Sequence, residues 1–155
     1  MNPITSGAVA GLAGTTVMTG AMLLTKRAGM VPGELEPVEI AENFEEGIGV
    51  RDRLPEPAFE ASWTVLHFGY GTLSGVAYAV AHESVSGPER PLLMGLTFGL
   101  SLWAFGYCVW LPVCGLYPPP TRVPKRKAAA NILAHAVYGM ATVAAHRVLW
   151  DEPEG

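Results

Sequence analysis

Two histidine–tyrosine pairs recur in this chain in the same context. Residues 67–71 read His-Phe-Gly-Tyr-Gly and residues 135–139 read His-Ala-Val-Tyr-Gly, and each pair lies in a long segment without Asp, Glu, Lys or Arg. Imidazole and phenol groups bind metals, form hydrogen bonds with polar ligands and exchange protons. The repeated spacing indicates two ionisable histidines held at one depth of the structure.

The polar residues around each pair recur at offsets of three and four, which places them on one face of a helix. Four positions of the first set correspond to four of the second, His67 with His135, Tyr70 with Tyr138, Ser74 with Thr142 and Tyr78 with His146, so they predict an internal repeat of two helical hairpins. We term these residues the polar seam: His67, Tyr70, Ser74, Tyr78 and His82 in the first set, and Asn131, His135, Tyr138, Thr142 and His146 in the second.

The elements that position the seam are four long segments that, histidines apart, carry no charged side chain except Arg147 near the end of the fourth. They cover about 4–25, 61–82, 91–115 and 128–149, close to the roughly 20 residues that a helix needs to cross a bilayer. Charged residues make up 15% of the 155, against about 25% in soluble proteins. The sequence predicts an all-α fold, a four-transmembrane-helix bundle that forms one integral membrane domain over residues 1–155.

Small residues spaced by about one helical turn occur in every span, which is typical of closely packed membrane helices. The expected packing positions are Gly7, Gly11 and Gly14 in the first span, Gly71 and Gly75 in the second, Gly95 and Gly99 in the third, and Gly139 in the fourth.

Lys and Arg gather in the first and third connections between the spans, around 26–53 and 122–127. The positive-inside rule therefore places these two connections in the cytoplasm and both termini outside. The first connection also predicts an amphipathic helix over about 38–47. Its apolar residues Ile40, Ala41 and Phe44 should dock on the bundle or a partner, while its glutamates face water.

Three interpretations of the seam remain open, because an ionisable group inside the hydrocarbon is costly unless it has an interior role. The seam residues could serve only as hydrogen-bonding contacts between helices, with no cofactor. Alternatively, His67 and His135 could be two axial ligands of haem b, or hold another metal, in an electron-transfer subunit. In the third interpretation the seam is a proton or small-solute path, although the spans lack the Asp and Glu usual in proton relays.

Motifs for nucleophilic catalysis, phosphate binding and paired carboxylates are missing from the sequence. We therefore expect a protein that is not an enzyme and has no nucleic-acid partner.

Several short phrases carry a family resemblance. Leu66-His67, the run from Gly75 to Tyr78, Ala81-His82-Glu83, the run from Leu111 to Pro119 and Ala134-His135 resemble the YagU-like inner-membrane proteins. The resemblance implies a protein of the bacterial cytoplasmic (inner) membrane with a loose link to acid tolerance, and it identifies no catalytic residues. We expect an accessory or envelope-homeostasis protein in the lipid bilayer, working as a homo-oligomer or within a larger membrane complex.

Overall fold

The computed structural model describes residues 1–83 and 90–150, and every regular element in these ranges is helical, as predicted. The 84–89 and 151–155 parts of the expected domain lie outside the described residues. The elements in chain order are α1 (Pro3–Arg27), α2 (Glu36–Gly47), the 3-10 turn η1 (Arg51–Arg53), α3 (Glu56–Glu83), α4 (Pro91–Phe105), the π-helical turn η2 (Gly106–Trp110), α5 (Leu111–Val113), the 3-10 turn η3 (Pro120–Arg122) and α6 (Lys125–Trp150).

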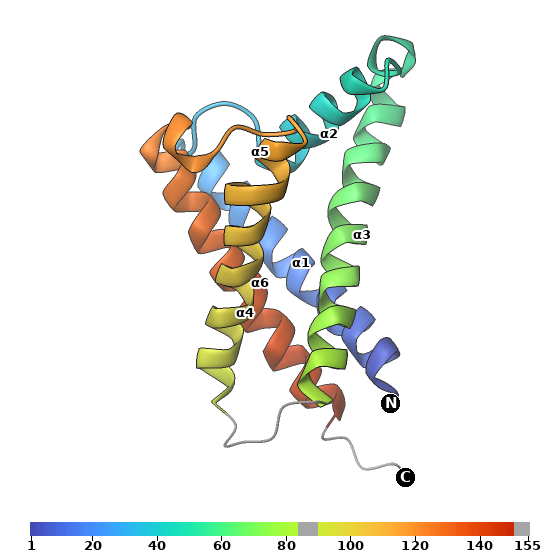
Figure 1. Cartoon of the computed structure of the whole chain (residues 1–155), viewed down its shortest axis with the longest axis vertical. Coiled ribbons are helices and arrows are strands. Elements are labelled where there is room, and N and C mark those ends of the chain that lie inside the picture. The colour runs from blue at the N-terminus through green and yellow to red at the C-terminus, as the bar shows by residue number, and fades with distance from the viewer. Residues whose placement is uncertain (84–89, 151–155) are drawn as a thin grey trace.

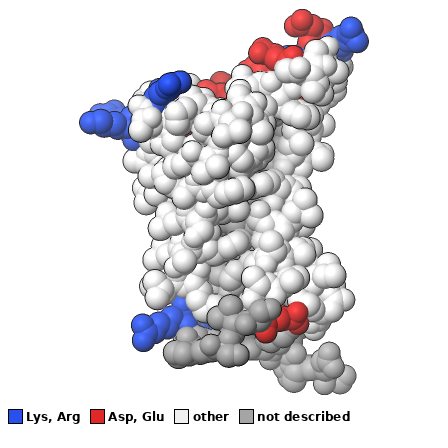
Figure 2. Space-filling view, in the orientation of Figure 1, with Lys and Arg blue, Asp and Glu red and all other residues white. Residues whose placement is uncertain are grey.

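Three helices among the described residues are long and apolar enough to cross a membrane. They cover Pro3–Arg27, Pro91–Val113 and Lys125–Leu149. The helix of the second predicted span, α3, has 28 residues and is not among the three, because the many polar side chains and glycines between residues 61 and 82 lower its mean hydropathy. On the face shown in Figure 2, charged side chains lie at the two ends, and the wide band between them is uncharged.

The long helices pack as two pairs. α3 lies against α1, α4 lies against α6, and α1 and α6 join the pairs, whereas α3 and α4 share no comparable interface. This is the arrangement expected of two hairpins placed side by side. The start of α1 and the end of α6 lie at the same end of the bundle, opposite α2 (Figure 1).

Glycines allow the backbones of each pair to touch. A Cβ at Gly75 on α3 would overlap Gly11 of α1, and a Cβ at Gly99 on α4 would overlap the carbonyl oxygen of His135 on α6. The other predicted packing positions lie at the same crossings and have equally little room: Gly7 and Gly71 between α1 and α3, Gly14 between α1 and α6, and Gly95 and Gly139 between α4 and α6.

The helix predicted over 38–47 is present as α2 and ends at Gly47 as expected, but it begins at Glu36, where Pro37 occupies its first turn. The expectation that its glutamates face water is wrong for Glu45, which is 3% exposed, and Glu36, which precedes the predicted range, is equally buried. Glu45 accepts a hydrogen bond from Ser62 of α3, so this carboxylate ties α2 to the bundle.

The third predicted span, 91–115, is not one regular helix. After α4 the chain makes a π-helical turn, η2, and resumes as α5 at Leu111, directly before Pro112. A proline cannot donate to the preceding turn, and π-turns are frequent at functional sites. The turn buries Tyr107, which is 8% exposed, between the helices.

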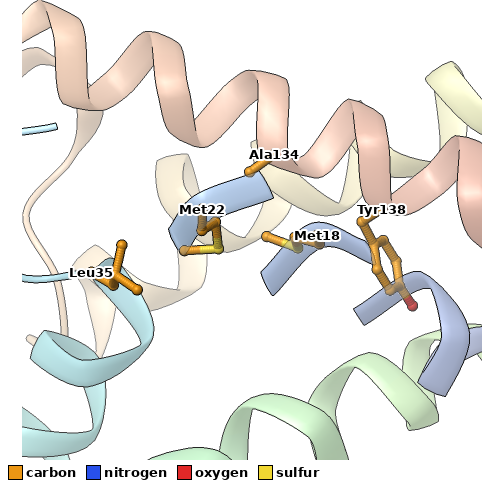
Figure 3. Close-up of a cluster of buried hydrophobic side chains, with 5 residues drawn as sticks. All are labelled: Met18, Met22, Leu35, Ala134 and Tyr138. Atoms are coloured by element: carbon orange, nitrogen blue, oxygen red, sulfur yellow. The ribbon is translucent and has the colours of Figure 1, made fainter. Parts of the chain in front are cut away.

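A cluster of buried side chains joins α1 and α6 to the segment before α2. Figure 3 shows Met18 and Met22 of α1 packed between Leu35 and the α6 residues Ala134 and Tyr138. The cluster holds the N-terminal end of α2 against the two helices that form the centre of the bundle.

The glycine contacts predict a sharp difference between two identical substitutions. Gly99→Ala should lower the free energy of unfolding by about 1–3 kcal/mol, because the added methyl group must push α4 away from the α6 backbone. Gly20→Ala is the matched control, since nothing lies within 4 Å of its Cβ position on α1. Thermal unfolding in mild detergent measures both, and equal stabilities of the two variants would contradict the packing.

Candidate functional site

A cavity of about 290 Å³ lies inside the bundle, roofed by α2 and bounded by α1, α3, η2 and α6. One histidine–tyrosine pair from each half of the repeat lines the cavity, His67 with Tyr70 and His135 with Tyr138. The remaining lining residues are mostly apolar or aromatic: Thr15, Met18, Pro37, Ile40, Ala41, Phe44, Leu66, Gly71, Leu102, Gly106, Tyr107, Trp110, Leu111 and Leu116.

The cavity has its mouth on the outer face of the bundle. Three of its lining side chains are well exposed, Phe44 at 41% on α2, and Leu66 at 46% and Tyr70 at 42% on α3. In a bilayer these apolar and aromatic groups would lie against lipid. A lipid-soluble molecule could therefore enter from the side.

His67 is held by α1 across the α1–α3 contact. Its Nε2 lies 3.0 Å from the Thr19 hydroxyl, and that hydroxyl donates its only hydrogen to the Thr15 carbonyl at 2.7 Å. With its hydrogen given to Thr15 the hydroxyl can only accept from the ring, so we assign the hydrogen of His67 to Nε2 and the lone pair of the neutral ring to Nδ1.

His135 is held by its own helix. Its Nδ1 lies 2.9 Å from the Asn131 carbonyl oxygen, which only accepts, so Nδ1 carries the hydrogen and Nε2 carries the lone pair. The ring of Tyr107 packs edge-on against this imidazole at 5.4 Å between centroids. Each histidine is thus anchored by one nitrogen and keeps the other as an acceptor.

Tyr138 closes the cavity on the side of the bundle centre. Its hydroxyl crosses from α6 and donates to the Gly71 carbonyl of α3 at 2.6 Å. Ser74 and Thr142, both buried, lie one helical turn further along the seam. This hydrogen bond links the two hairpins directly beneath the cavity.

The seam does not act as one site. His67, Tyr70, His135 and Tyr138 share the cavity, whereas Tyr78, His82 and His146 form a separate ring cluster nearer the termini, with centroids 5.5–5.7 Å apart. Asn131 lies outside both groups, against the start of α2.

The histidines do not fit the haem interpretation. His135 has the arrangement of a metal ligand, with Nδ1 hydrogen-bonded to a carbonyl and Nε2 free. His67 has the reverse arrangement, because Thr19 occupies its Nε2 and only the more crowded Nδ1, next to the main chain, remains. Among the described residues no group of three His, Cys, Asp or Glu side chains could hold a metal ion.

Several site residues could not be identified from the spacing of the seam. Thr19 lies in the first span with no sequence relation to His67, and Tyr107 and Trp110 reach the cavity only because η2 turns them inward. The α2 residues that cover the cavity were recognisable in the sequence as one apolar face. The cavity itself could not be predicted from the sequence.

The two hydrogen-bond anchors predict opposite tautomers. In nitrogen-15 NMR of histidine-labelled protein at neutral pH, His67 should carry its hydrogen on Nε2 and His135 on Nδ1. His67→Gln and His135→Gln assign the signals by their disappearance. The same tautomer in both rings would contradict the anchoring.

Comparison with known proteins gives a family but no activity. No curated protein and no solved structure matches the chain, and nothing found links it to the YagU-like proteins, so that resemblance stays an expectation. One family profile, described as a family of unknown function, matches residues 1–154. The chain, which folds around a side-opening histidine cavity, therefore belongs to the DUF6789 family.

Proposed function

We propose that this protein is a four-span membrane protein that binds a small hydroxyl-bearing apolar molecule taken from the bilayer. The observation that carries the proposal is the cavity, in which two histidines present acceptor nitrogens within an apolar, aromatic lining. Binding pockets for small molecules usually combine such a lining with a few convergent polar groups.

The volume limits the size of the ligand. Cavities that hold drug-sized molecules measure about 300–1,000 Å³, and about 150 Å³ is enough for benzene. A cavity of about 290 Å³ suits one ring with a short substituent inside, and a longer tail would extend through the mouth into lipid. The rings of Tyr70, Tyr107 and Trp110 offer stacking and edge contacts to such a head group.

The histidine tautomers select the chemistry of the head group. With Nε2 of His67 and Nδ1 of His135 already donating, each neutral ring has only an acceptor left to offer. A ligand with hydroxyl donors, such as a quinol, a phenol or a lipid alcohol, satisfies both acceptors. A ligand with only carbonyl or ether oxygens leaves them unpaired, which costs binding free energy.

The proposal also includes the number of membrane spans, their orientation and the cellular role of the protein. α3 is taken as a fourth span because it packs against α1 and runs from one end of the bundle to the other (Figure 1). The basic connections then face the cytoplasm and both termini face outward, in a bacterial inner membrane. An accessory role in envelope or acid-stress homeostasis, without catalysis of its own and within an oligomer, is compatible with a lipid-binding cavity.

A pair of probe molecules tests the proposal. A short-chain alkyl hydroquinone should quench the fluorescence of Trp110 in nanodiscs, and its dimethyl ether, which has the same apolar body but no donors, should bind at least tenfold more weakly. His135→Leu should weaken hydroquinone binding roughly tenfold, the loss expected for a hydrogen bond of about 1–1.5 kcal/mol.

His82→Leu is the matched control, because it makes the same change in the separate ring cluster. It should leave hydroquinone affinity unchanged. Equal affinity for the hydroquinone and its ether, or equal losses in the two leucine variants, would refute the proposed recognition.

A further inference from the structure

A second buried polar group lies where α2 meets α6, outside the cavity. Glu36 is 3% exposed, and Asn131, the first residue of the second seam set, is 4% exposed. Oε1 of Glu36 and both polar side-chain atoms of Asn131 are buried and make no hydrogen bond within 3.5 Å among the described residues. Three such atoms in one place are unusual, because buried polar groups are normally satisfied. The Asn131 side chain is nevertheless close enough to Glu36 to oppose, in part, the rise that burial causes in the pKa of its carboxyl group.

Glu36 and Asn131 line a small void of about 10 Å³ that is partly open to the outside, and its other walls include Tyr107, Tyr117 and Trp103. A space of roughly 10–15 Å³ with two to four polar neighbours holds one water molecule. The unsatisfied set contains two acceptors, Glu36 Oε1 and Asn131 Oδ1, and one donor, Asn131 Nδ2. Water suits this mixture because it both donates and accepts, whereas a metal cation would be repelled by the amide donor.

The charges around Glu36 leave it without a direct ion pair in the structure. Lys127 on α6 is 5% exposed, but its Nζ binds Glu39 of α2 at 2.7 Å and lies 5.9 Å from the ring centre of Tyr117. Burial raises the pKa of Glu36, and the nearby charge of Lys127 opposes that rise only in part. Burial also raises the pKa of Tyr117, so the phenol stays neutral beside the carboxyl group.

We propose that Glu36 and one water molecule bound in this void form a proton-binding site at the basic end of the polar seam. When Glu36 is ionised, the water donates to Oε1 and accepts from Asn131 Nδ2. When a proton arrives, the new carboxylic O–H donates to the water, and the water turns to donate to Asn131 Oδ1. One proton enters and one O–H bond forms, and no other covalent bond changes.

Proton relays in membrane proteins usually contain Asp or Glu, which the predicted spans lack. Glu36, which precedes the second predicted span, places such a carboxyl group next to the seam. Asn131 accepts a hydrogen bond from His135 through its main-chain oxygen, and Tyr107 borders both the void and the cavity. A proton held by Glu36 therefore lies next to the seam instead of at the protein surface. The site is independent of the cavity ligand, so either proposal can fail alone.

Infrared spectroscopy of the full protein in nanodiscs tests the site. On acidification, one carboxyl group should show its protonated C=O stretch at a higher pH than the exposed carboxyl groups do, because burial disfavours its charged form. Glu36→Gln should remove this early band. Glu45→Gln, the same change at the other buried carboxyl group of α2, and Glu46→Gln, on its exposed side, should both keep it. An early band that survives Glu36→Gln would overturn the assignment.

Two substitutions at the other wall of the void test the water. Asn131→Leu fills the space with apolar atoms, so the C=O band of Glu36 should move to higher frequency as its hydrogen bond is lost. Asn131→Ala leaves room for water and should keep the band at its original frequency. An unchanged frequency in a folded Asn131→Leu variant, or the same shift in both variants, would refute the proposal that a water molecule binds between Glu36 and residue 131.

Discussion

Contact between helix backbones at glycine is the constraint on which the rest of the structure depends. In lipid, helices associate through close packing instead of the hydrophobic effect, so small residues decide which faces meet. Gly11 and Gly75 join α1 to α3, and Gly99 and Gly139 join α4 to α6. α3 and η2 instead carry the bulky side chains Tyr70 and Trp110, which prevent the two backbones from touching. The cavity occupies the space left between α3 and η2.

The same packing fixes the chemistry of the cavity. Because α3 lies directly on α1, Thr19 reaches His67 and Thr15 reaches the turn around Gly71. Tyr138 then spans from α6 to the Gly71 carbonyl, so the floor of the cavity has its polar groups paired. The nitrogens left over on the two imidazoles are a consequence of this pairing, and they are the acceptors that the proposed ligand would meet.

Local features predicted the helices well, because the absence of charges and the spacing of glycines are properties of short stretches of sequence. Tertiary contacts were beyond such patterns. Glu36 looks like an exposed residue of a connection, and only the docking of α2 buries it against Asn131. The inward position of Tyr107 depends on a π-helical turn, which the regular helical periodicity of the third span could not indicate.

Native mass spectrometry of protein released from its own membranes tests the central claim, a cavity that takes a molecule from the bilayer. The wild type should carry a small apolar adduct with a hydroxyl group. Leu102→Trp, which fills the cavity from α4, should lose the adduct, and Leu100→Trp, the same change at an exposed position on that helix, should keep it. A wild type without any adduct, or an adduct retained in Leu102→Trp, would contradict the account.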